Sequence, residues 1–152
     1  KRLGVYFVHE SDLEFDDRAI LPTYGTEFAA GADLYAVLDN TISINPGETV
    51  FIGTGLGMEI PEGYAGFIYA RSGLSTKKGL APANKVGVID ADYRGEIKVA
   101  LYNQSNELRT IEPGERIAQI VIAPFLKCEF NLTNKLNETE RGNGGFGSTG
   151  LK

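Results

Sequence analysis

Short runs of β-branched, aliphatic and aromatic residues, each ended by a turn signal, make up most of this chain. Such runs are typical of β-strands that pack one face on a core. Strands are therefore expected over residues 4–9, 32–37, 41–44, 49–53, 56–60, 64–70, 86–90, 96–102 and 116–125. The polar stretch 10–17 is expected to be a connection, and only residues 72–78 suggest a short helix.

Two of the turn segments have matching sequences. Residues 45–48 read NPGE and residues 112–115 read EPGE, so both have Pro in the second position and Gly in the third. Proline presets φ to about −65° and glycine reaches positive φ, which together favour a type II turn. A strand is expected after each turn, so we expect the two turns to be equivalent corners of the sheet structure.

The pattern as a whole predicts one all-β domain, a sandwich or jelly roll. The 152 residues include 19 Gly and 6 Pro, too many for a helical bundle, and no alternation of strands with long helices is visible. The apolar pattern fades from Asn131 onward. We therefore expect a β domain over residues 1–135 and a flexible glycine-rich tail over residues 136–152.

Charge and composition limit the partners. The formal net charge of −5 gives no broad basic surface for nucleic acid, so a phosphate-rich ligand would need a few local Arg and Lys. No apolar run approaches the about 20 residues that span a bilayer, and no leader is visible at the start, so no membrane partner and a cytoplasmic location are expected, with a nuclear or viral setting left open. The single cysteine, Cys128, is expected to be a small buried thiol.

Four segments contain candidate chemistry for an anionic ligand. In the tail, the glycines of residues 141–150 allow backbone N–H groups to approach an anion, Arg141 and the hydroxyls of Ser148 and Thr149 add donors, and Phe146 has no local packing partner. A flexible linker is the alternative. In residues 70–77, Arg71 and Ser72 begin the short helix and suit phosphate oxygens, with ordinary N-capping by Ser72 as the alternative.

The other two segments place carboxylates beside apolar strands. Val86 to Ile89 is expected to be a buried-type strand, and Asp90 directly after it is suited to hold and deprotonate a water molecule. Asp33 is suited to a Mg²⁺ ion that substrate phosphates also hold, or to a structural hydrogen-bond network. Residues 114–120 contain Arg116 and Gln119, and an ordinary core strand is the default interpretation there.

Together and in this order, the segments AGADLYA, ARSGLSTK, NKVGVIDADYRG, GERIAQI and RGNGGFGSTG resemble the five motifs of the trimeric deoxyuridine triphosphate pyrophosphatases, the dUTPases. The resemblance covers residues 30–150. It implies a distorted jelly roll with one short helix, a homotrimer with active sites at the subunit interfaces, and Mg²⁺ as cofactor. It also implies hydrolysis of dUTP to dUMP and pyrophosphate, which keeps uracil out of DNA and supplies dUMP for thymidylate synthesis.

The resemblance also implies roles for individual residues. Asp90 would activate the water that attacks the α-phosphorus, Tyr93 would exclude a 2′-hydroxyl, and Asp33 would act on Mg²⁺ through water or structurally. Uracil would be read around Asn84, Gly87, Val88, Ile89 and Lys98. The phosphates would be held by Arg71, Ser72, Gly73 and Gln119, and the tail residues Arg141, Phe146, Gly147, Ser148 and Thr149 would close over the nucleotide.

Two alternatives stay open at this point. A deoxycytidine triphosphate deaminase would share the fold, but no additional acid or base for a 4-amino group is evident. A binding or signalling protein that uses the nucleotide as a switch is the second alternative. Lys85 departs from the small or apolar residue expected after Asn84, which affects the contacts expected there.

Overall fold

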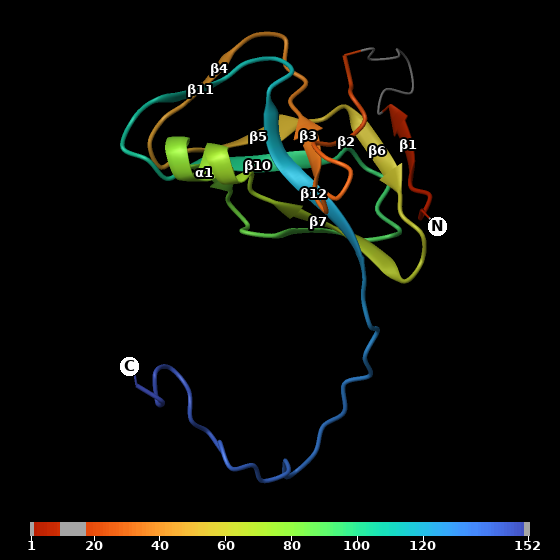
Figure 1. Ribbon diagram of the computed structural model, residues 1–152, viewed down its shortest axis with the longest axis vertical. Helices are drawn as coiled ribbons and strands as arrows, with labels where there is room; N and C mark the ends of the chain where they lie inside the picture. The colour runs from red at the N-terminus through yellow and green to blue at the C-terminus, as the bar shows by residue number, and fades with distance from the viewer. Residues whose placement is uncertain (1, 10–17, 151–152) are drawn as a thin grey trace.

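The computed structural model describes residues 2–9 and 18–150, and the connection expected over 10–17 lies outside these ranges. Its elements are β1 (Tyr6–His9), β2 (Thr23–Tyr24), β3 (Ala32–Tyr35), β4 (Ile42–Ile44), β5 (Thr49–Gly53), β6 (Leu56–Glu59), β7 (Tyr64–Tyr69), α1 (Ser72–Lys78), β8 (Leu80–Pro82), β9 (Gly87–Ile89), β10 (Lys98–Asn103), β11 (Arg109–Ile111) and β12 (Arg116–Pro124). The helix has the bounds that the sequence predicts, and each expected strand is present with small shifts at its ends (Figure 1).

Three strands, β2, β8 and β11, are not predicted by the apolar pattern. They contain two or three residues each, and β8 ends in a proline. Each becomes a strand because a longer or equally short neighbour supplies hydrogen-bond partners: β2 pairs with β3, β8 with β10, and β11 with β4. Runs this short have no period of their own to detect.

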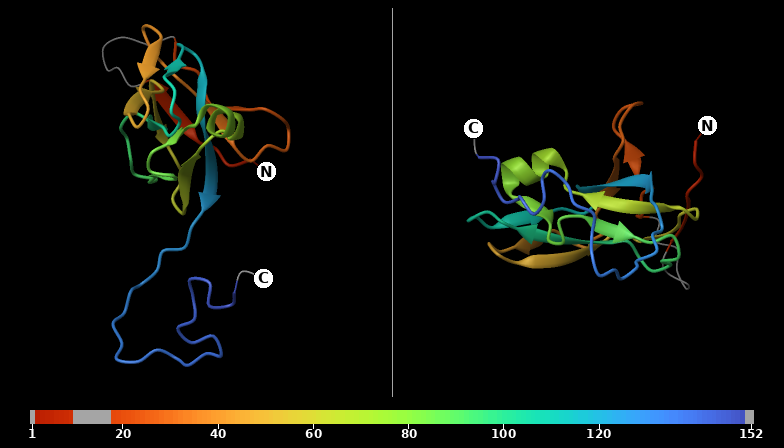
Figure 2. Two further views of the ribbon diagram at one scale, coloured as in Figure 1. Left: turned by 90° about the vertical axis from the view of Figure 1, so that its left-hand side faces the viewer. Right: turned by 90° about the horizontal axis from the view of Figure 1, so that it is seen from below.

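Four antiparallel sheets pack around one core. The largest has the order β2-β3-β12-β7-β9, a second has the order β5-β10-β8, and two pairs, β1-β6 and β11-β4, complete the described part (Figures 1 and 2). Leu34, Ile52, Leu101 and Ile117 come from different strands of the two larger sheets, and each is at most 1% exposed. The predicted all-β jelly-roll class is confirmed.

The two NPGE and EPGE turns have the same conformation. Gly47 and Gly114 both have φ of 78°, as a type II turn requires of its third residue. The closing hydrogen bond from the fourth N–H to the first carbonyl is 3.0 Å at residues 45–48 and 3.1 Å at residues 112–115. In each turn the carboxylate of the final Glu also accepts a hydrogen bond from the N–H of the first residue, which explains why both end in Glu.

After β12 the chain leaves the body of the molecule. Residues 125–150 contain no strand or helix, and Figure 1 shows them extending away from the sheets. Cys128 lies in this segment and is exposed, so the expectation of a buried thiol is wrong. The reason is that the apolar neighbours of Cys128 in sequence have nothing to pack against within their own chain. The division at residues 135 and 136 stays a prediction.

One buried polar side chain joins the three-stranded sheet to the β11-β4 pair. Asn103, at the end of β10, is 0% exposed. Its Nδ2 donates to the carbonyls of Ile44 at 2.9 Å and Glu107 at 2.8 Å. Its Oδ1 accepts from the backbone N–H of Ser105 at 2.9 Å and from the Ser105 hydroxyl at 2.7 Å. The amide is therefore satisfied at both ends, and it connects β10 to β4 and to the loop before β11.

Replacing Asn103 by Ala should lower the free energy of unfolding by about 1–3 kcal/mol, because two carbonyls and a backbone N–H lose a buried partner. Urea denaturation followed by circular dichroism measures this change. Asn106→Ala, at an exposed position in the same loop, is the matched control and should change the stability by no more than about 0.5 kcal/mol. Equal effects of the two substitutions would show that the buried amide does not connect the sheets energetically.

Candidate active site

The central strand of the large sheet brings three of the predicted site residues together. β12 lies between β3 and β7, and in this register Gln119 is opposite both Asp33 and Tyr69. β7 ends at Tyr69, and Arg71 follows at the start of the helix. The side chains of Asp33, Arg71 and Gln119 therefore collect at one place although they are far apart in the sequence.

Asp33 is held in this cluster by two guanidinium groups. The Nε of Arg71 donates to Asp33 Oδ1 at 2.9 Å, and Nη1 of Arg116 lies 3.5 Å from Oδ2. The Asp33 side chain is 14% exposed, so solvent screens these pairs less than it screens the surface pairs of the chain. These contacts support the structural interpretation of Asp33, and the bond from Arg71 also fixes the direction of the Arg71 side chain.

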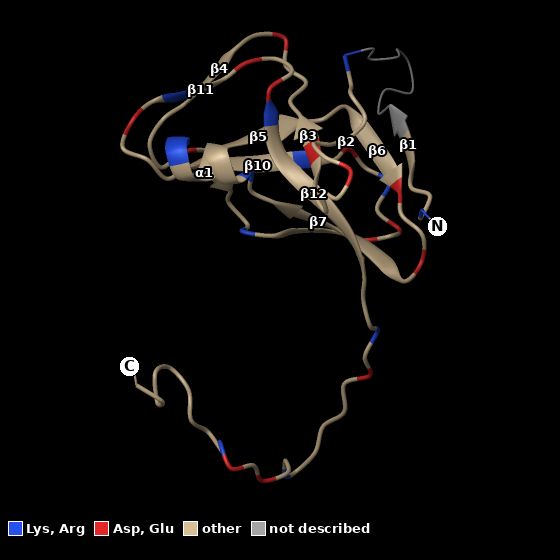
Figure 3. Ribbon diagram, in the orientation of Figure 1, with Lys and Arg blue, Asp and Glu red and all other residues tan. Residues whose placement is uncertain are grey.

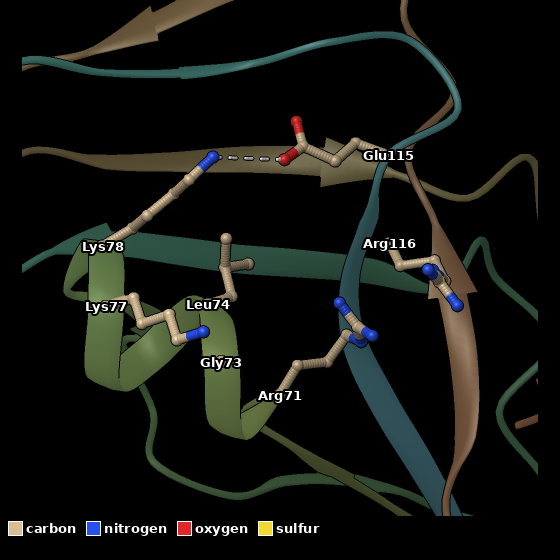
Figure 4. Close-up of a pocket in the computed structure, with 7 residues that line it drawn as sticks. All are labelled: Arg71, Gly73, Leu74, Lys77, Lys78, Glu115 and Arg116. Atoms are coloured by element: carbon tan, nitrogen blue, oxygen red, sulfur yellow. Dashed lines mark ion pairs between the residues drawn. The ribbon is translucent and has the colours of Figure 1, made fainter.

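A cavity of about 340 Å³ lies beside this cluster. We call it the cationic cavity; its lining residues are Arg71, Gly73, Leu74, Lys77, Lys78, Glu115 and Arg116. Figure 4 shows these side chains reaching it from α1 and from the start of β12, with Lys78 paired to Glu115 at 3.9 Å. Positive charges of α1 and of the start of β12 are visible in Figure 3. Four cations and one carboxylate make this cavity suitable for phosphate groups.

Ser72 is the first helical residue and not the cap. The N-cap of α1 is Arg71, and no side chain caps the helix. Ordinary N-capping by Ser72 is therefore wrong as an explanation of this residue, and the exposed hydroxyl stays available to a ligand. Lys77 and Arg116 also line the cationic cavity, although the sequence pattern did not identify them as phosphate-binding residues. For Lys77 the sequence did contain a signal, because Lys77 lies in the same short helix that Arg71 begins.

The residues expected to read uracil gather along a second, narrower cavity of about 80 Å³. We call it the β9–β10 cavity; Asn84, Gly87, Val88, Ile89 and Lys98 line it together with Ile68, Pro82, Val99 and Ala100. In the described part of the chain β9 pairs only with β7, and β10 pairs with β8 only from Leu101 onward. The N–H of Ala83 donates to the carbonyl of Ala100 at 2.7 Å, so the backbone edges that stay open to a ligand are those of β9 and of β10 before Ala100.

The position of β9 at the sheet edge also corrects one expectation. Residues 86–89 are not a buried strand: Val86 is 39% exposed and Val88 is 58% exposed, while Gly87 is buried. The outer edge of β9 leaves backbone N–H and C=O groups unpaired, and the exposed side chains of Val86 and Val88 are in addition free to pack on a ligand or another chain. The continuous apolar run in the sequence does not distinguish a buried strand from an exposed edge strand.

Asp90 and Tyr93 lie in the turn that follows β9. The N–H of Tyr93 donates to the carbonyl of Asp90 at 3.1 Å, and the Tyr93 hydroxyl donates to the carbonyl of Glu96 at 2.9 Å. These two bonds fix the turn and the tyrosine ring. The Asp90 side chain is exposed and lines a third cavity, of about 620 Å³, together with Asp92, Phe125 and Lys127 among others.

The tail residues lie apart from all three cavities in the single chain. Phe146 is fully exposed, and the Nε of Arg141 donates to the carbonyl of Gly144 within the tail itself at 2.8 Å. Figure 2 shows the C-terminal segment separated from the sheets. The structure therefore gathers the residues around Arg71 in one group and those around Gly87 in another, and it brings the tail to neither group.

Comparison with known proteins of similar sequence and structure identifies one class. A family model described as dUTPase matches residues 17–150. The deoxyuridine 5'-triphosphate nucleotidohydrolase of Desulfitobacterium hafniense is 55% identical over 132 residues, which cover 86% of this chain and 87% of that protein. The protein of the same name from Idiomarina loihiensis is 50% identical over 131 residues, covering 86% and 87%.

A solved structure of the Staphylococcus bacteriophage 80alpha dUTPase with dUPNHPP is similar to this chain with a TM-score of 0.84. The two sequences are 30% identical, and the match covers 97% of this chain and 99% of that one. The chain belongs to the dUTPase family. Among the residues that the structure describes, no helix is long and apolar enough to cross a membrane.

The family resemblance implies Mg²⁺, and the residues present suit an ion that the substrate phosphates also hold. Across residues 2–9 and 18–150, no group of three or more His, Cys, Asp or Glu could hold a metal ion. Asp33 is already paired with two guanidinium groups. Mg²⁺ binds commonly through substrate phosphates with one or two protein carboxylates and several waters, which requires no such protein cluster.

Replacing Asp33 by Asn should lower the free energy of unfolding by about 1.5–3 kcal/mol, because the charge that Arg71 and Arg116 share is removed from a largely buried position. Thermal or urea unfolding measures the loss. Asp39→Asn is the control, since Asp39 pairs with Arg18 at the surface with 86% of its side chain exposed, and it should cost no more than about 1 kcal/mol. A smaller loss for Asp33→Asn than for Asp39→Asn would contradict a structural role for Asp33.

Proposed function

We propose that this protein hydrolyses dUTP to dUMP and pyrophosphate, with Asp90 as the group that activates the attacking water. The observation that carries the proposal is the β9–β10 cavity, because the residues expected to read uracil line it and Asp90 follows at the end of β9. The relatives named as deoxyuridine 5'-triphosphate nucleotidohydrolases support the same substrate. The dUMP would serve thymidylate synthesis, and removal of dUTP would keep uracil out of DNA.

Uracil is read by backbone in this proposal. It has a donor and two acceptors on one edge, and the open edges of Gly87–Ile89 and of the start of β10 offer N–H and C=O groups across a gap of about 80 Å³. Backbone groups of two strands have fixed positions, so they select the uracil edge without the entropy loss of ordering long side chains. Lys98 contributes through its backbone, since its Nζ lies 3.4 Å from Glu96 Oε2.

Tyr93 discriminates deoxyribose from ribose in this proposal. Its hydroxyl is held by the Glu96 carbonyl, and a Cβ at Gly95 would lie 2.5 Å from that hydroxyl oxygen. The ring therefore has no freedom to move away on the Gly95 side. A fixed ring under the sugar leaves no volume for a 2′-hydroxyl, which lowers the affinity for UTP.

The phosphates occupy the cationic cavity. Arg71, oriented by Asp33, provides a planar donor group, Ser72 and Gly73 provide the exposed start of α1, and Gln119 contributes its amide. Mg²⁺ held by the triphosphate supplies further neutralisation of the phosphate charge when it is bound. The role of the protein is to hold the chain of phosphates in one orientation, so that the α-phosphorus faces the water.

The chemical step transfers the deoxyuridylyl group, through its α-phosphorus, to water. The Asp90 carboxylate accepts a proton from the water as its oxygen bonds to the α-phosphorus, and the bond from that phosphorus to the oxygen bridging to the β-phosphate breaks. Pyrophosphate leaves with the electron pair of that bond. The basic side chains around the phosphates stabilise the charge that develops on it.

We further propose that the active site is completed in a homotrimer. In one chain the cationic cavity, the β9–β10 cavity and the tail are separate, whereas one nucleotide must contact all three. Apolar residues alternate with polar ones along the exposed segment after β12: Leu126, Cys128, Phe130, Leu132 and Leu136 lie at every second position except 134. Phe130 is 95% and Leu132 102% exposed, which is typical of a strand face that another chain covers.

The tail then closes over a nucleotide bound to neighbouring subunits. Phe146 would stack on uracil, and Arg141 together with Gly147, Ser148 and Thr149 would hold the terminal phosphates. The exposure of Phe146 in the single chain supports this role, since a phenyl ring with no packing partner gains most from covering a base. The intrachain bond of Arg141 to Gly144 leaves the other guanidinium nitrogens for phosphate.

Asp90→Asn should lower kcat for dUTP by at least about 100-fold while the affinity for a dUTP analogue with an α,β-imido bridge changes little, because the amide has the shape of the carboxylate but cannot accept the proton. Pyrophosphate release and isothermal titration calorimetry measure the two quantities. Asp92→Asn, at the exposed neighbouring carboxylate, is the control. Turnover of the Asp90→Asn variant near the wild-type rate would place the base elsewhere.

Pyrophosphate release and ammonia release, both measured on the wild-type protein, compare dUTP with dCTP, dTTP and UTP. Pyrophosphate release from dUTP alone agrees with the proposal. Ammonia release from dCTP would identify a deaminase and overturn it, and equal rates for UTP and dUTP would contradict the role of Tyr93.

Phe130→Lys combined with Leu132→Lys should disrupt the trimer, because two charges would lie on the face that a neighbouring chain covers. Sedimentation velocity measures the assembly, and dUTP turnover should fall with it. Asn131→Lys combined with Thr133→Lys places the same charges on the polar face of the same segment and should leave the trimer intact. A wild-type protein that sediments as a monomer while it hydrolyses dUTP would refute this assembly.

A further inference from the structure

Gly31 of the AGADLYA motif has no assigned role, yet it is in tight contact with Gln119. It lies directly before β3, two positions ahead of Asp33, and the Gln119 side chain covers its Cα. A Cβ built at Gly31 would overlap Gln119 Oε1 and would lie 2.9 Å from Cδ and 3.2 Å from Cγ. Real Cβ atoms essentially never approach other atoms within 3.0 Å, so any side chain at this position must displace the Gln119 amide.

Position 31 requires glycine because the Gln119 side chain fills the space of a Cβ atom, and not because of the backbone conformation. Gly31 is not among the glycines with positive φ, such as Gly47 and Gly114, where the backbone conformation itself favours glycine. Alanine is therefore compatible with the backbone of Gly31. The three nearest atoms to such a Cβ all belong to the flexible side chain of Gln119, which can swing away without a change in the sheet.

The other end of the Gln119 amide is also fixed. Nε2 donates to the carbonyl of Ala70 at 2.8 Å, and Ala70 is the residue directly before Arg71. With Oε1 against Gly31 and one N–H on Ala70, the amide plane is held from both sides. The amide group has two N–H donors, so one remains for a ligand. This arrangement connects β3, β12 and the start of α1 through a single side chain.

We infer that Gly31 is a positioning residue. Because it has no side chain, it leaves the space in which the Gln119 amide keeps the orientation that presents its second N–H to the α-phosphate. This inference rests on the proposed function, which gives Gln119 its substrate contact. A methyl group at residue 31 would push the amide out of its place, break the bond to Ala70, and leave the fold intact. Misplacement of a substrate-positioning group by about 1 Å can cost on the order of 100-fold in rate.

A double-mutant cycle of Gly31 and Gln119 tests the inference. Gly31→Ala should lower kcat/KM for dUTP by about tenfold or more, and Gln119→Ala should do the same. In the Gln119→Ala background, the additional Gly31→Ala change should alter kcat/KM by less than about twofold, because the displaced amide is already absent. The midpoint of thermal unfolding should remain close to that of the wild type for Gly31→Ala.

Gly25→Ala is the matched control. Gly25 is exposed, a Cβ there meets nothing within 4 Å, and this residue is not among the glycines with positive φ. Its kcat/KM should equal that of the wild type. This substitution measures what the loss of glycine flexibility alone does to the protein.

Each outcome decides the inference. Full activity of Gly31→Ala, or a loss that multiplies independently with that of Gln119→Ala, would overturn it, and so would a loss explained by unfolding at the assay temperature. If the wild-type protein itself releases no pyrophosphate from dUTP, the proposed function fails. In that case a crystal structure of Gly31→Ala still tests the geometry, and an unmoved Gln119 amide would refute it.

Discussion

The register of β12 is the constraint on which the rest of the site depends. This strand pairs with β3 on one side and β7 on the other, and Gln119 is opposite a residue of each. A slip by one residue would turn the Gln119 side chain to the other face and bury Ile120 or Ala118 differently. Because Ile117, Ala118 and Ile120 are at most 3% exposed, the core holds this register. The cluster of Asp33, Arg71 and Gln119 is therefore maintained by apolar packing.

The edge of the same sheet has the opposite property. β9 has one strand partner in the described structure, so its outer backbone groups and Val88 are open. An open edge usually favours aggregation, and proteins protect it or use it. Here the open edge lies across a narrow cavity from the start of β10, and a flat base of the right size would satisfy both. In the proposed function, the same sheet provides a rigid centre for the residues that hold phosphate and an open edge for the base.

A single chain holds these parts but does not bring them together. The apolar face of residues 126–136 is uncovered, and Phe146 contacts nothing near it. Burial of such a face contributes roughly 25 cal/mol per Å², so association with other copies would be favourable once the tail can reach them. Assembly and catalysis are coupled in this proposal, because the segment that joins the subunits also leads to the tail that closes over the nucleotide.

The strand pattern, the helix at 72–78 and the type II turns followed from the sequence alone, because apolar alternation, helix propensity and the φ preferences of Pro and Gly act locally. The resemblance of five motifs named the site residues and the family. Tertiary structure alone decided the rest. The strands β2, β8 and β11 exist through their partners, Val88 and Cys128 are exposed because of where their segments lie, and Arg71 is the cap of α1. Lys77 and Arg116 at the cationic cavity, and the contact of Gly31 with Gln119, depend on distances between residues remote in sequence, which no local pattern encodes.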